Sequence, residues 1–116
     1  MEPHIVKVPL PADEFGTVVA EHRHGMIKVV VDIEKRVLAL GGDLHADGEQ
    51  RLLDDGSRQE DIWGANIYPG KPPGEQIEYT SMINIRPRQG NRSMDITEAT
   101  LRDAVAGVIR SLLPLF

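Results

Sequence analysis

The sequence predicts a single α+β domain in which three helices pack on a largely antiparallel or mixed sheet of about five strands. Three observations lead to this class. The chain has 116 residues, a length typical of one domain with a core of its own. Its apolar residues fall into short runs separated by turn signals. These runs follow in the order β-α-β-β-α-β-β-α, so neighbouring strands are expected to pair as hairpins.

The first two elements are a strand and a short helix. Residues 4–10 read as a strand that Pro9 and Pro11 end, because proline cannot donate to a ladder. Pro11 also suits the start of a helix. Apolar residues then recur at helical spacing, which predicts a helix over residues 12–23 with Gly25 as its stop signal.

The next two elements form a hairpin. Residues 26–32 and 37–40 are dense in β-branched and aliphatic residues. Their nearly continuous apolar character predicts strands that are covered on both faces and therefore lie centrally in the sheet. The connecting residues 34–36 contain no glycine, so the sequence leaves the turn type open.

A second helix is expected over residues 48–55. Asp47 and Gln50 have the spacing of a capping box, and Gly56 can end the helix in a left-handed conformation. Two alternating strands follow at residues 61–68 and 76–86, joined by the Pro- and Gly-rich residues 69–74. In the first of these strands, Trp63 is expected to face opposite to Asn66.

The last element is a helix that begins after Asp95, with Glu98 at capping-box spacing. Its apolar residues recur at the helical period, so one face should pack against the sheet. Pro114 ends it. The predicted apolar stripe consists of Leu101, Val105, Val108, Ile109, Leu112 and Leu113.

Composition excludes several functional classes. The sequence has no cysteine, which removes disulfides, thiol nucleophiles and Cys-ligated metals. Acidic residues lie among the first 30 residues and the apolar runs are short, so neither a signal peptide nor a membrane span is expected. A cytoplasmic location follows as an expectation. The net charge of −5 makes nucleic-acid binding unlikely, because phosphate contacts dominate that affinity.

The first candidate for chemistry lies after Gly41 and Gly42. His45 and Asp47 would point the same way in an extended segment and could share a proton or a divalent ion. Two ligands do not make a metal site, so no metal is predicted. Alternatively, Asp47 is an N-cap and His45 packs at the start of the helix.

The second candidate is Asn66 with Tyr68. An amide among apolar strand residues needs hydrogen-bond partners, which a ligand could provide. The alternative is that Asn66 is paired across the sheet and Trp63 is core.

The third candidate is the stretch with Arg86, Arg88 and Arg92, which contains no acid and precedes a helix. Guanidinium groups and a helix N-terminus both attract anions, and Gly90-Asn91 marks a turn. The alternative is that these arginines pair with the protein's own acids, which cluster at residues 54–55 and 60–61.

Four blocks of the sequence are distinctive: residues 41–47, 56–69, 81–87 and 90–93. With these blocks, essentially the whole chain resembles a family of small uncharacterised microbial proteins held as a domain of unknown function. The resemblance implies one domain. It implies no activity, cofactor or catalytic residue.

Together these observations predict a small soluble protein with a polar site for an anionic small molecule. If the protein is an enzyme, its acid–base candidates are His45, Asp47 and Asp61. The ligand-binding candidates are Asn66, Arg86, Asn91 and Arg92. No cofactor is identified. The alternative is a non-catalytic interaction module that forms a homodimer or binds a partner through an exposed strand face or the apolar residues 112–116.

Overall fold

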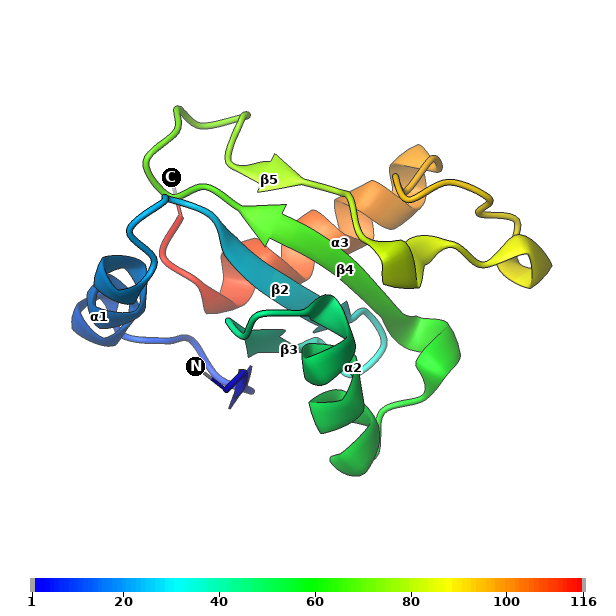
Figure 1. Cartoon of the computed structure of the whole chain (residues 1–116), viewed down its shortest axis with the longest axis horizontal. Helices are drawn as coiled ribbons and strands as arrows, with labels where there is room; N and C mark the ends of the chain where they lie inside the picture. Colours follow the sequence, from blue (N-terminus) through cyan, green and yellow to red (C-terminus); the bar gives the residue numbers. More distant parts are fainter. Residues whose placement is uncertain (1, 116) are drawn as a thin grey trace.

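The five strands form one sheet in the order β1-β3-β2-β4-β5, and every pairing between them is antiparallel (Figure 1). The computed structural model describes residues 2–115. It confirms the α+β class and the predicted order of elements. These are β1 (His4–Val6), α1 (Ala12–Glu21), β2 (Ile27–Asp32), β3 (Val37–Leu40), α2 (His45–Asp54), β4 (Ile62–Ile67), β5 (Ile77–Glu78) and α3 (Ala99–Leu112).

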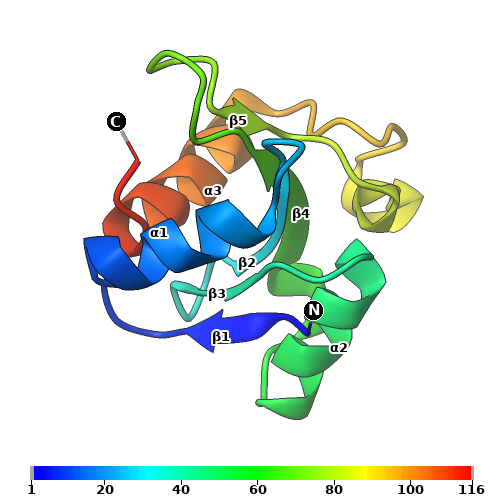
Figure 2. The ribbon, with the colours of Figure 1, turned by 60° about the vertical axis from the view of Figure 1, so that its left-hand side comes forward.

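The sheet lies between two helices on one face and one helix on the other (Figure 2). Helices α1 and α3 cover the larger cluster, to which β2 contributes Val29 and Val31. Helix α2 covers the smaller cluster around Val30, Leu52 and Ile62. Because strand side chains alternate, β2 and β3 supply both clusters. Both strands lie inside the sheet, as their continuous apolar runs predicted.

The β2–β3 hairpin closes without glycine because an aspartate takes over the turn. Oδ1 of Asp32 accepts hydrogen bonds from the backbone N–H groups of Glu34 and Lys35, both at 2.9 Å. Arg36 then adopts a φ of 57°. Aspartate side chains commonly accept hydrogen bonds from the backbone of the turn that follows them. This explains how the hairpin turns without glycine.

The strands at the two edges of the sheet are shorter than predicted. The predicted strand at residues 4–10 ends at Val6. Beyond it, Pro9 has no N–H to donate, and the N–H of Leu10 donates to the carbonyl of Leu112 in α3 instead of to a strand. The predicted strand at residues 76–86 is wrong beyond Glu78. A 3₁₀ turn at Met82–Asn84 interrupts its second half, and another at Pro87–Gln89 follows it.

Two helix starts also differ from the prediction. Helix α2 begins at His45, so Asp47 lies inside its first turn and Leu44 is the N-cap. Helix α3 begins at Ala99, and Asp95 accepts a hydrogen bond from Thr80 Oγ1 instead of capping the helix. The predicted apolar stripe of α3 is confirmed, since its residues are buried in or packed against the larger cluster.

Candidate functional site

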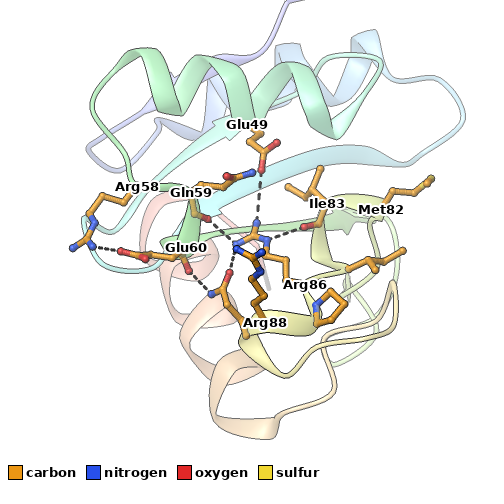
Figure 3. A pocket seen from close by; sticks show the side chains of 11 residues that line it. Glu49, Arg58, Gln59, Glu60, Met82, Ile83, Arg86 and Arg88 are labelled. Carbon is orange, nitrogen blue, oxygen red and sulfur yellow. Dashed lines mark hydrogen bonds and ion pairs between the residues drawn. The ribbon is translucent and has the colours of Figure 1, made fainter.

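A groove lined by residues of α2 and of the segment 80–94 is present in the structure. Figure 1 shows α2 and this segment on either side of β4. The groove consists of two hollows that share Met82 and Ile83. The His45 hollow has a volume of about 390 Å³, and the Arg86 hollow, shown in Figure 3, about 990 Å³. The His45 hollow is further lined by Lys28, Leu44, His45, Ala46, Asn66, Thr80, Ser81 and Met94. The Arg86 hollow is further lined by Glu49, Arg58, Gln59, Glu60, Ile85, Arg86, Pro87, Arg88 and Gln89.

The guanidinium of Arg86 hydrogen-bonds to backbone carbonyls at the start of β4 (Figure 3). Its nitrogens donate to the backbone carbonyls of Ile83 at 3.0 Å, Gln59 at 2.7 Å and Ile62. The cation also lies 4.6 Å from the ring centre of Trp63 and 3.7 Å from the carboxylate of Glu49. Burial lowers the pKa of Arg86 and Glu49 opposes this, so the group stays charged. The protein itself therefore occupies the donors that an external anion would need.

Asn84 and Asn91 hold the irregular segment in place. Asn84 accepts from the N–H of Gly64 at 2.8 Å and donates to the carbonyl of Gly64 at 2.9 Å, so its amide replaces a neighbouring strand. Asn91 donates to the carbonyl of Asn84 and accepts from the N–H of Thr97. Both are buried, whereas Arg92 is exposed. Asn91 is thus a structural residue whose hydrogen bonds are internal.

The two acids predicted beside His45 lie elsewhere. His45 and Asp47 stand two positions apart on a helix, where side chains do not share a face. Asp47 is exposed and lines a separate hollow with Glu2 and Asp43. Asp61 precedes β4, and partial burial and the nearby charge of Asp32 raise its pKa. Neither acid contributes to the groove.

His45 lies partly buried at the start of α2, with Nε2 2.7 Å from the carbonyl oxygen of Ala65. A carbonyl only accepts, so Nε2 carries the proton and Nδ1 of the neutral ring keeps its lone pair. Burial lowers the pKa of His45 and the charge of Lys28 adds to this shift, whereas the Ala65 carbonyl and the Asn66 side chain oppose it. The imidazole is therefore neutral at pH 7, with one nitrogen able to accept a hydrogen bond.

Asn66 lies in the same hollow, directly opposite Lys28 in the β2–β4 register. Its Nδ2 donates to Glu78 Oε1 at 2.8 Å and to the Thr80 carbonyl at 3.4 Å, which fixes the orientation of the amide. Its Oδ1 is buried and has no hydrogen-bond partner within residues 2–115. An unpaired buried acceptor costs free energy, and the neighbouring His45, whose pKa the Asn66 side chain raises, is the polar group in the protein that can offset this cost. Tyr68, predicted beside it, donates to the same Glu78 carboxylate.

The positive groups at this hollow are also unpaired. Leu44 cannot cap α2 with its side chain, and the N–H groups of His45 and Ala46 have no partner in the described part of the chain. The Lys28 ammonium has no carboxylate within ion-pair distance among the same residues. A free cation and an uncapped helix N-terminus together form a favourable environment for negative charge.

The rim of the groove includes exposed apolar side chains. Its large apolar side chains are Leu44 (60% exposed), Met82 (72%), Ile85 (42%) and Met94 (42%). Of the large apolar side chains that are exposed in residues 2–115, only Val8 lies elsewhere. Such clustering marks binding surfaces, whereas scattered exposed apolar residues need no explanation.

The structure thus brings His45 and Asn66 together and leaves the other predicted site residues apart. Lys28 was not among the predicted site residues, although it is the only charged residue within the apolar run 27–31. Met82 and Met94 were not predicted either, because they carry no distinguishing sequence signal. In residues 2–115 no three His, Asp or Glu side chains are placed to hold a metal ion together.

None of the helices within residues 2–115 is long and apolar enough to cross a bilayer. Searches against curated proteins and against solved structures returned no match. A scan of family models gave a match over residues 4–112. This range contains all four distinctive sequence blocks, so the predicted resemblance is confirmed. The chain belongs to the family described as "Protein of unknown function (DUF5674)".

Proposed function

We propose that this protein binds a small molecule with an anionic group in the His45 hollow. The observation that carries the proposal is that Lys28, which has no ion-pair partner within residues 2–115, lines the same hollow as the uncapped N-terminus of α2. Both groups attract negative charge, and neither has a partner within residues 2–115. The proposal moves the anion site away from Arg86, because backbone carbonyls already occupy that guanidinium.

Each residue of the hollow has a separate part in binding. Lys28 and the free N–H groups of His45 and Ala46 hold the anionic group. Asn66 Oδ1 and His45 Nδ1 are acceptors, so they disfavour a ligand that brings additional negative oxygens. The Met82 side chain covers the apolar part of the ligand from the rim.

Calorimetric titration with acetate and with inorganic phosphate tests this proposal. Lys28→Met keeps the length of the side chain and removes its charge, so it is expected to weaken anion binding at least tenfold. Lys71→Met is the matched control, because Lys71 is exposed and lies over the ring of Tyr68. This control should change the affinity less than twofold. Absence of binding by the unaltered protein, or equal losses in both variants, would contradict the proposal.

A second candidate is the interaction module, which the exposed apolar rim favours. Leu44, Met82 and Met94 could cover an apolar patch of a partner or of a second copy of the chain. We also propose a cytoplasmic location, which the absence of cysteine suits. Nucleic acid remains a disfavoured partner because the net charge is −5.

A further inference from the structure

The uncharged part of the ligand has an apolar path to follow out of the His45 hollow. Met82 and Ile83 line both hollows, so the two hollows meet at these side chains, and Ile85 and Pro87 are the other apolar residues of the Arg86 hollow. Met82 is the most exposed of the rim residues at 72%. Methionine side chains are flexible and polarisable, and they adapt to apolar ligands of varying shape.

The anionic group itself is best matched by a single negative charge. Lys28 is the one unpaired cation at the hollow within the described residues. A phosphate monoester carries nearly two charges and several acceptor oxygens. Those oxygens would lie close to Asn66 Oδ1 and the lone pair of His45, which are acceptors too. A carboxylate has one charge and two oxygens, so it suits one ammonium and two backbone N–H groups.

The lining also disfavours a ligand built on an aromatic ring. Apart from the imidazole of His45, no aromatic side chain lines either hollow in residues 2–115. Trp63 is not available for stacking, because Arg86 lies over its ring inside the protein (4.6 Å). Nucleobases and other flat rings therefore find no stacking partner, whereas the aliphatic side chains of Ile83 and Ile85 suit an aliphatic chain.

We infer that the ligand is an unbranched aliphatic monocarboxylate. Its carboxylate lies at Lys28 and the N-terminus of α2, and its hydrocarbon chain follows Met82 and Ile83 towards the Arg86 hollow. This inference rests on the proposed function and adds the chemical class of the ligand. Specificity then comes from one charge at one end and from apolar contact along the groove.

The test is a calorimetric titration with straight-chain carboxylates from acetate to decanoate, each kept below its micelle concentration. Full burial of a methylene strengthens binding about fourfold, so in this open groove each added methylene should lower Kd by roughly two- to threefold until the groove is filled. The straight-chain alcohol of the same length should bind at least tenfold more weakly, because it lacks the charge that Lys28 holds.

Two variants separate the chain from the charge. Met82→Gln keeps the shape of the side chain and should reduce the gain in affinity per methylene, measured as the slope of log Kd against chain length. Val8→Gln is its matched control, since Val8 is equally exposed at 71% and lies outside the groove. Lys28→Met should weaken all carboxylates by the same factor.

The outcomes distinguish the two proposals. If acetate binds at Lys28 and longer chains bind no better, the inference about the hydrocarbon chain is overturned and the proposed anion site stands. Stronger binding of phosphate than of any carboxylate has the same meaning, as does an equal loss in Met82→Gln and Val8→Gln. If no anion binds, the proposed function itself fails.

Discussion

At the scale of single residues, His45 couples the candidate site to pH. Its pKa is lowered in the folded protein, chiefly by burial, from an ordinary value of 6.5. Between the folded and unfolded pKa values, the unfolded chain binds more protons than the folded one. The contribution of His45 to the free energy of unfolding therefore increases with pH through this window. It is lost as pH falls from 6.5 through the lowered pKa of the folded protein.

His45→Gln should remove this contribution, since glutamine does not titrate and its amide can still donate to the Ala65 carbonyl. We expect urea unfolding at a series of pH values between 5 and 7.5 to show a smaller rise in stability for this variant. His24→Gln, at an exposed position, is the matched control and should retain the slope of the unaltered protein. An unchanged slope in His45→Gln would show that His45 is not the group responsible.

The candidate site shows which residues a sequence can identify. His45 was predicted from its spacing to Asp47 after two glycines, and Asn66 because an amide inside an apolar strand needs partners. Arg86 and Asn91 were predicted from an arginine cluster with a turn before a helix, yet their partners are backbone carbonyls of the protein. Sequence reveals that a polar group requires a partner, but only the folded backbone decides whether the partner is the protein or a ligand.

At the scale of elements, hydrophobic periodicity predicted the helices and strands that pack on the core. It did not predict the segment that side-chain hydrogen bonds hold in an irregular conformation. The stripe of α3 and the β2–β3 hairpin follow directly from apolar spacing. The segment after Glu78 alternates as a strand would. However, Ser81 accepts from the N–H of Ile83 and Asn84 bonds to Gly64, which together bend the chain out of the sheet. Such local competition is not visible in the pattern of apolar residues.

The contact of α2 with the sheet depends on a glycine. A Cβ added at Gly48 would lie 2.7 Å from Cγ2 of Val30 in β2. Gly48→Ala should therefore destabilise the protein by about 1–3 kcal/mol through overpacking, despite the better helix propensity of alanine.

Gly107→Ala in α3 is the matched control for this substitution. An added Cβ there meets no atom within 4 Å, so only helix propensity changes. The control should stabilise the protein by roughly 0.5–1 kcal/mol. Denaturation midpoints measure both values, and a stabilising Gly48→Ala would refute the close approach of α2 to β2.

At the scale of the whole molecule, charge and apolar exposure are unevenly distributed. The chain carries −5 overall, yet Lys28, Arg88 and Arg92 have no acidic partner within residues 2–115. Lys28 lies in the same groove that collects most of the exposed apolar side chains. One side of the molecule thus combines both features of a surface for apolar anions.

Sedimentation velocity separates the two candidate functions at this scale. A groove that serves a small ligand predicts the mass of one chain, 12.8 kDa, throughout the micromolar range. Association through the rim would instead raise the mass with concentration, and Met82→Gln would reverse the increase. That second result would favour the interaction module over the small-molecule site.

The amide of Asn84 has a further consequence for behaviour at high concentration. Backbone groups at the margin of a sheet can recruit strands from other molecules and start fibril growth. Here Asn84 and Arg86 already occupy the outward groups of Gly64 and Ile62, and Pro3 and Pro9 flank β1 at the opposite margin. The same side chains that bend residues 81–86 out of the sheet therefore also protect the protein against self-templated aggregation.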